Sequence, residues 1–259
     1  MFKTYLTVPL LLLLSYIIAT LAGAELTKRG RLKPTLRRLP AIDAIEEAVN
    51  RSTEMGRPVH YTVGFGGGRG VNEPGLIPGL GILQNVATLC ARNNIPLIHT
   101  CGFGELMPIA DEAIREGAVL SGNPEWYRPE YNRFISQEVY SYALGVVNII
   151  ENEKPGASFL IGNVWGEALI ITEPAAAQGI MQVSGCRTFS AMPFLIASCD
   201  YVLILSEMYN VSAYYTKDEM LVGSYLGTDT AQLITVILLI LGFVLALSGQ
   251  DLFKILTKW

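Results

Sequence analysis

The stretch GRPVHYTVGFGGGRG, residues 56–70, joins a predicted β-strand to a glycine-rich loop. Residues 58–65 are mostly β-branched and aromatic, which is typical of a strand. Four glycines and a basic residue follow within a few positions: Gly64, Gly66, Gly67, Gly68 and Arg69. Loops of this kind often hold phosphate groups in α/β proteins, so the surrounding sequence must show whether this one is a binding loop or a turn.

The strand at 58–65 is the first of five that alternate with predicted helices. The other strands are 95–102, 157–162, 180–185 and 200–207, and the helices between them are 78–94, 105–118, 133–153, 166–179 and 189–199. A further helix, 39–56, precedes the first strand. Short apolar strands separated by helices predict an α/β fold, a Rossmann-like three-layer sandwich on a mostly parallel five-stranded sheet.

Apolar runs at both ends of the chain indicate membrane helices. The chain is 51% hydrophobic and 16% charged, whereas about 25% charged residues is usual in soluble proteins. The uncharged runs 5–23 and 231–249 are long enough to cross about 30 Å of hydrocarbon. The expected organisation is an N-terminal anchor (1–27), a basic juxtamembrane linker (28–40), an α/β domain (41–228), a C-terminal transmembrane helix (229–249) and a short tail (250–259).

The basic residues after the first run predict the topology. Residues 28–38 hold six arginines and lysines, whereas only Lys3 and the N-terminal amine precede the run. The positive-inside rule places the basic side in the cytoplasm, where it can also attract anionic lipids. We therefore expect a two-pass protein of the cell membrane, with both termini outside and the central domain cytoplasmic. The alternative is a signal peptide cleaved near the small residues 22–24.

The glycine loop fits neither of the common nucleotide-binding motifs. A Walker loop needs a lysine and a hydroxyl residue after its last glycine, and Arg69 occupies the third glycine position of GxGxxG. The loop is therefore either a turn or an anion site formed by backbone amides and Arg69. Residues that follow other strands would complete such a site. The candidate ligand-binding residues are Gly64, Gly66, Gly67, Gly68, Arg69, His99, Glu105, Asn163 and Arg187.

No catalytic or metal-binding motif is evident, so the sequence predicts no catalytic residues and leaves enzyme activity open. The four cysteines lack CxxC spacing, and two histidines are too few for a histidine-rich metal site. Glu105 and Glu167 each follow a glycine at a predicted helix start, where the helix dipole is sufficient reason for a carboxylate. The domain lacks the basic patches that nucleic-acid binding requires. The sequence names no cofactor.

An aromatic connection at residues 122–134 is a candidate interface. Trp126, Tyr127 and Tyr131 lie near two arginines, and such residues are enriched at binding hot spots. A second copy of the chain or another membrane protein is the expected partner. The alternative is that this connection packs on its own domain.

The stretches LPAIDAIEEAV (39–49) and EMGRPVHYT (54–62), together with the basic residues after the anchor, resemble an uncharacterised family of archaeal and bacterial membrane proteins. The family is described only as a domain of unknown function, so it implies membrane anchoring and no activity. The leading hypothesis is a membrane-anchored, non-catalytic scaffold or binding module in a membrane assembly. The alternative is an enzyme or sensor that binds a small anionic or nucleotide-like ligand at the glycine-rich edge of the sheet.

Overall fold

The computed structural model describes residues 7–32, 39–65 and 74–247. The chain divides into two compact units, which are residues 37–216 and a second unit formed by 1–36 with 217–259. The first unit is an α/β domain. The second contains two long helices, α1 (Thr7–Lys28) and α9 (Glu219–Leu247).

The α/β domain is built on a sheet of six parallel strands in the order β3-β2-β1-β4-β5-β6. The strands are β1 (Val59–Thr62), β2 (Leu97–Cys101), β3 (Asn132–Phe134), β4 (Ala157–Gly162), β5 (Met181–Cys186) and β6 (Tyr201–Ile204). This is the strand order of doubly wound Rossmann folds. The predicted parallel α/β fold is confirmed, but the predicted number of five strands was wrong. The sixth strand is β3, a three-residue edge strand that is too short to show a pattern.

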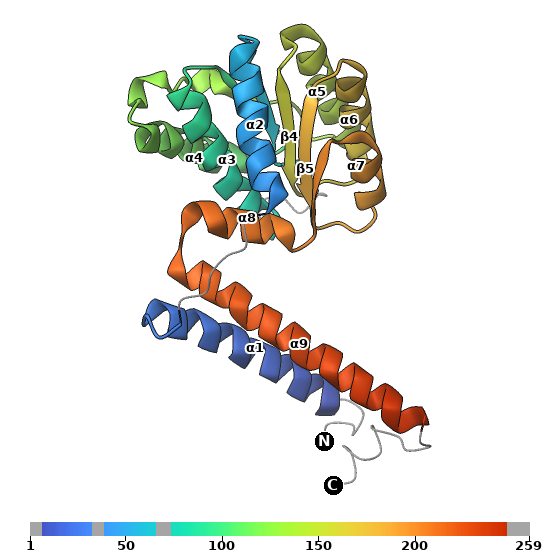
Figure 1. The fold of residues 1–259 in the computed structure, drawn as a ribbon. Helices are drawn as coiled ribbons and strands as arrows, with labels where there is room; N and C mark the ends of the chain where they lie inside the picture. Colours follow the sequence, from blue (N-terminus) through green and yellow to red (C-terminus); the bar gives the residue numbers. More distant parts are fainter. Residues whose placement is uncertain (1–6, 33–38, 66–73, 248–259) are drawn as a thin grey trace. The chain divides into compact units, whose positions relative to one another are not determined.

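Helices cover both faces of the sheet (Figure 1). One face carries α2 (Pro40–Glu54), α3 (Leu76–Arg92) and α4 (Met107–Ser121), and α8 (Glu207–Thr216) packs on α3. The other face carries α5 (Val139–Glu153), α6 (Glu167–Ala177) and α7 (Met192–Ser198). Three short 3-10 turns are η4 (Gly104–Leu106), η5 (Pro124–Trp126) and η6 (Pro129–Tyr131). Every residue of β1, β2, β4 and β5 is buried, as expected for parallel strands enclosed between two helical layers.

The two faces of the sheet differ in chemistry. The face under α2 and α3 is largely apolar, and its main cluster includes Ile42, Ile45, Ile82 and Phe159. These residues come from the periodic apolar positions of α2 and α3 and from the centre of β4. The α2 helix buries its isoleucines because they recur at helical spacing.

The face under α5 and α6 carries a hydrogen-bonded polar layer. The imidazole of His60 on β1 lies 2.9 Å from the Ser158 hydroxyl on β4 and 3.0 Å from the Thr100 hydroxyl on β2. Further along the same face, the amide of Gln182 on β5 donates to the carbonyl oxygen of Thr172 on α6 at 2.9 Å. The first group joins β2, β1 and β4, and the second joins β5 to α6, so these side chains are satisfied although they are buried.

The two-helix unit is packed through small residues. Gly23 on α1 faces Gly223 and Gly227 on α9, and Gly227 also faces Ala19. Since lower numbers on α1 meet higher numbers on α9, the helices run antiparallel. A methyl group at any of the three glycines would overlap backbone atoms of the facing helix.

One helix of the described residues is long and apolar enough to cross a membrane. It is α9, over Glu219–Val244, with a mean hydropathy of 1.8. Residues 231–247 of the predicted apolar run belong to a longer helix that begins at Glu219, and residues 248 and 249 lie outside the described residues. Asp218 caps this helix by accepting the N–H groups of Met220 and Leu221 at 2.8 and 3.1 Å.

Candidate functional site

The carboxyl ends of β1 and β4 meet at the point where parallel α/β sheets usually bind ligands. From β1 the chain builds β2 and β3 on one side, then crosses over to β4 and continues outward on the other side. The crevice at such a topological switch point is the common ligand site of doubly wound folds. Here it is bordered by Gly64 and Phe65 after β1 and by the segment 163–167 after β4.

The backbones after β1 and β4 touch at this point. Asn163 donates its backbone N–H to the carbonyl oxygen of Val63 at 2.9 Å, which extends the pairing of the two strands. Gly64 has φ +82°, and a Cβ there would overlap the carbonyl oxygen of Asn163. Only glycine combines this left-handed conformation with such a close approach. The structure therefore brings together two of the predicted ligand-binding residues, Gly64 and Asn163.

Glu167, at the start of α6, places a buried carboxyl group at the same point. Its side chain is 1% exposed, and Oε1 accepts the backbone N–H of Phe65 at 3.3 Å. Oε2 is also buried and has no hydrogen-bond partner among the described residues. Burial raises the pKa of Glu167, although the backbone N–H groups of Glu167, Trp165 and Phe65 oppose this shift. The helix dipole explains a carboxylate at this position, but it does not explain the unpaired oxygen.

Asn163 contributes a second buried polar group without a complete set of partners. Its side-chain Oδ1 accepts the indole N–H of Trp165 at 3.2 Å. Its Nδ2 is buried and has no partner among the described residues. The Trp165 ring that holds Asn163 is itself 43% exposed. An amide donor, a carboxylate acceptor and an accessible aromatic ring are thus gathered at the switch point.

The cluster offers one hydrogen-bond donor, one acceptor and an aromatic ring. Within the ranges that the structure describes, no group of three or more histidine, cysteine, aspartate or glutamate residues could hold a metal ion. Cys186, at the end of β5, donates its thiol to the carbonyl of Thr188 at 3.4 Å, and burial raises its pKa. A thiol with a raised pKa is a poor nucleophile.

The remaining predicted ligand-binding residues are distributed differently. Gly66, Gly67, Gly68 and Arg69 lie outside the described residues. Glu105 is exposed in the η4 turn after β2, and Arg187 is exposed after β5. His99 is fully buried in β2, where its Nδ1 lies 2.9 Å from Oδ1 of Asn132. Its Nε2 is also buried and has no hydrogen-bond partner among the described residues, so the role of His99 in ligand binding stays a prediction.

Sequence reasoning missed Glu167 as a site residue. The available signal was the segment GNVWGE, 162–167, in which an amide, an indole and a carboxylate follow one strand within five residues.

The aromatic connection predicted as an interface packs on its own domain. Trp126 is 5% exposed, its indole N–H donates to the carbonyl of Ile95 at 2.9 Å, and its ring centroid lies 4.8 Å from that of Tyr131. Tyr127 donates its hydroxyl to Asp111 on α4 at 2.5 Å. Trp126 and Tyr127 thus use their polar atoms within the domain, and the interface role of this segment stays a prediction.

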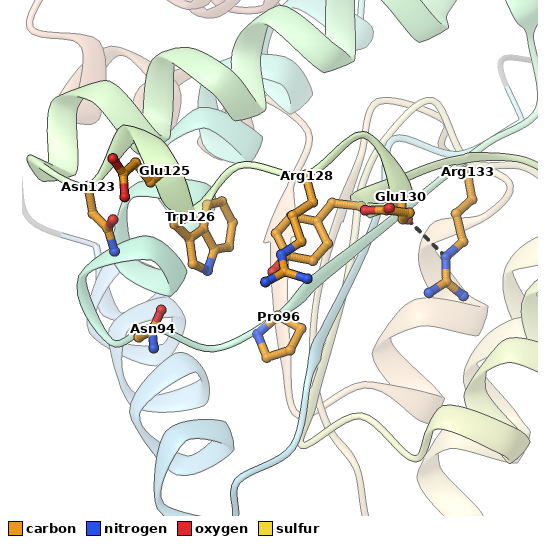
Figure 2. A pocket seen from close by; sticks show the side chains of 9 residues that line it. Asn94, Pro96, Asn123, Glu125, Trp126, Arg128, Glu130 and Arg133 are labelled. Atoms are coloured by element: carbon orange, nitrogen blue, oxygen red, sulfur yellow. Dashed lines mark hydrogen bonds between the residues drawn. The ribbon is translucent and has the colours of Figure 1, made fainter.

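A groove of about 680 Å³ lies beside this connection, near the amino end of β2 (Figure 2). Asn94, Pro96 and residues between 123 and 133 line it. Arg133 donates to the carbonyl of Glu130 at 3.1 Å and pairs with Glu153 at 3.0 Å. Its charge is thereby balanced within the domain, and the groove lies at the edge of the sheet opposite the switch point.

The model of a family described as "Domain of unknown function (DUF6754)" matches residues 1–257. The chain belongs to this family. Membership in DUF6754 confirms the resemblance to a domain of unknown function that was seen in the sequence, and the match spans both the two-helix unit and the α/β domain. No curated protein and no solved structure matches the chain. The function of this DUF6754 protein must therefore be inferred from its own residues.

Proposed function

We propose that the protein is a two-pass membrane protein whose α/β domain serves as a binding module at the cytoplasmic surface. The observation that carries this proposal is the antiparallel pair of α1 and α9. Gly223 and Gly227 form a GxxxG motif on α9, and Ala19 and Gly23 form a matching small-residue pair on α1. Membrane helices associate through such small residues because lipid provides no hydrophobic drive between them.

The outer surface of this helix pair is apolar. Leu13, Ile18 and Leu21 on α1 and Leu239 and Phe243 on α9 each expose more than half of their surface. Exposed apolar residues over the length of a helix would be unfavourable in water, whereas they match a hydrocarbon environment. The apolar surface therefore supports a membrane location for both helices.

The ends of the α/β domain are compatible with two adjacent spans. The hydroxyl of Tyr215, near the end of α8, donates to the carbonyl of Ile42 near the start of α2 at 3.4 Å. The chain therefore enters and leaves this domain at neighbouring points. Together with the basic residues 28–38, this arrangement supports a cytoplasmic domain held by a helical hairpin.

A second candidate function is recognition of a small ligand at the switch point. The buried, unpaired side-chain atoms of Asn163 and Glu167 favour it. A ligand-sensing domain and a membrane-bound binding module are compatible roles for one chain, because the ligand site and the helix pair use different residues.

The proposed topology predicts opposite accessibility of two engineered cysteines. In a chain whose own cysteines are replaced by alanine, Trp259→Cys is expected to react with a membrane-impermeant maleimide in intact cells. Lys33→Cys is expected to react only after the membrane is permeabilised. Labelling of residue 33 but not of residue 259 in intact cells would contradict the proposed orientation.

The glycine contact predicts a large response to added side-chain volume. Gly227→Ile is expected to destabilise the helix pair by about 1–3 kcal/mol, because the new side chain overlaps the backbone of α1. Spin labels at Leu13 and Leu239, both exposed, should then report a longer and broader distance distribution in nanodiscs. Leu233→Ile on the exposed side of α9 is the matched control and should leave the distribution unchanged. Identical distributions for both variants would refute the packed hairpin.

A further inference from the structure

Two unpaired polar atoms at the switch point define what a ligand there must offer. Oε2 of Glu167 can only accept a hydrogen bond while the group is ionised, and Nδ2 of Asn163 can only donate one. The remaining oxygens of both side chains are already engaged, Oε1 by Phe65 and Oδ1 by Trp165. Buried atoms of this kind destabilise a fold unless something pairs with them.

The two atoms belong to the same small region. Gly64 contacts the Asn163 backbone, and the next residue, Phe65, donates its N–H to Glu167. The backbone of Asn163 and the side chain of Glu167 therefore both adjoin one dipeptide at the end of β1, where a doubly wound fold binds its ligand. Asn163 is 2% exposed and Glu167 is 1% exposed, so the atoms that bury these two side chains must move before a ligand can reach them.

The pairing of one acceptor with one donor selects against charged ligands. An anion would be repelled by the Glu167 carboxylate, and an ammonium group could not satisfy the Asn163 N–H. A hydroxyl group can both donate and accept. Two adjacent hydroxyls would satisfy both atoms, one donating to Oε2 and the other accepting from Nδ2. The exposed ring of Trp165 offers an apolar face beside them, on which a base or a sugar ring can stack.

We infer that the switch point between β1 and β4 binds a neutral ligand carrying adjacent hydroxyl groups, either the ribose of a nucleoside or a free sugar. This inference rests on the second candidate function and names the class of ligand for it. Glu167 accepts one hydroxyl, Asn163 donates to its neighbour, and Trp165 packs against the ring. No bond is made or broken in this assignment.

The binding test uses the full chain in detergent micelles with four probes. These are adenosine, methyl α-D-mannopyranoside, 2′,3′-dideoxyadenosine and inorganic phosphate. Tryptophan fluorescence is the readout, because Trp165 is partly exposed and bonded to Asn163. We expect adenosine or the mannoside to change the fluorescence saturably, and the one that does so identifies the nucleoside or the sugar as the source of the hydroxyls.

The dideoxy probe distinguishes ligand binding at the switch point from specific recognition of adjacent hydroxyl groups. It should bind at least tenfold more weakly than adenosine if adjacent hydroxyls are recognised. Equal binding of adenosine and 2′,3′-dideoxyadenosine, or binding of phosphate alone, would overturn the diol assignment and leave ligand recognition at this edge standing. Failure of all four probes to bind would overturn both.

A neutral isostere tests the role of the carboxylate. Glu167→Gln is expected to weaken binding of the responding probe by about tenfold to a hundredfold, the loss typical of one charged hydrogen bond. Its melting temperature without ligand should equal or exceed that of the parent chain, since the variant removes a buried, half-paired charge. Glu173→Gln, on the exposed side of the same helix, is the matched control and should change neither quantity. A lower melting temperature with unchanged affinity would assign Glu167 a structural role and overturn the inference.

Discussion

Lowering the pH from 7 to 5 is expected to destabilise the α/β domain by about 4 kcal/mol, through His60 and His99. These are the only two histidines in the chain, and both are fully buried. Burial lowers the pKa of His60 from 6.5 to about 3, with smaller contributions from His99 and Arg133. Burial lowers the pKa of His99 to about 4, although its hydrogen bond to Asn132 acts in the opposite direction.

The direction of the effect follows from which state binds the proton. A histidine with a lowered pKa stays neutral in the folded chain at pH 5, whereas the unfolded chain binds a proton at each site below about pH 6.5. Protonation thus favours unfolding, and stability is lost as the pH falls from 6.5 towards the folded pKa values. At pH 5 each histidine contributes about 2 kcal/mol of this loss. Glu167 acts in the opposite direction, because its raised pKa makes the folded state gain stability on acidification.

The measurement is the melting temperature of the domain by near-ultraviolet circular dichroism at pH 7 and pH 5. For a domain of this size, 4 kcal/mol corresponds to a decrease of about 10 °C. The double variant His60→Gln, His99→Gln should be less stable at pH 7, because it disturbs the contacts with Ser158 and Asn132, but it should lose much less on acidification. An equal decrease in the variant would show that carboxylates, and not the histidines, are responsible.

The polar side chains around His60 show which structural features the sequence predicts and which it does not. His60 lies inside the predicted strand 58–65, and the structure buries its side chain completely. Its partners Ser158 and Thr100 come from strands 98 and 40 residues away in the chain, so their convergence depends on the strand order. Alternating strands and helices predict a parallel sheet, but the periodicity of hydrophobic residues does not predict the order in which the strands pair.

The missed strand β3 has a local cause. Among the strands that the structure describes, residues 132–134 pair with β2 alone, and the polar side chains of Asn132 and Arg133 give no apolar alternation. What makes this segment a strand is tertiary contact: Asn132 bonds to His99 and also donates to the carbonyl of Met107 at 2.8 Å. Tertiary context of this kind overrides local propensity.

The candidate site was predictable only in part. Gly64 and Asn163 both follow strands, and carboxyl ends of parallel strands share an edge, so their proximity could be expected. The importance of Glu167 could not, because a carboxylate at a helix start is usually solvated and favourable. Its unpaired buried oxygen lies beside Phe65, which directly follows the close approach of Gly64 to Asn163, and this tertiary contact is not contained in the local sequence.

Gly64→Ala is accordingly expected to cost about 3 kcal/mol of stability. A left-handed backbone costs a residue with a Cβ about 1–2 kcal/mol, and Gly64 has φ +82°. The added Cβ would also overlap the carbonyl oxygen of Asn163, and forced overpacking typically adds about 1–3 kcal/mol. The melting temperature of the domain should fall by about 10 °C. Because the ends of β1 and β4 must separate, binding of any responding probe at the switch point should be lost as well.

Gly104→Ala provides the matched control, because Gly104 also follows a strand of the same sheet but has open space around it. No heavy atom lies within 4 Å of a Cβ built at Gly104, and its φ is not in the left-handed region. Its substitution should change stability by less than about 0.5 kcal/mol. If Gly64→Ala were equally mild, the backbones after β1 and β4 could separate without cost. Glu167 and Asn163 would then have room to reach water, and their unpaired atoms would no longer require a ligand.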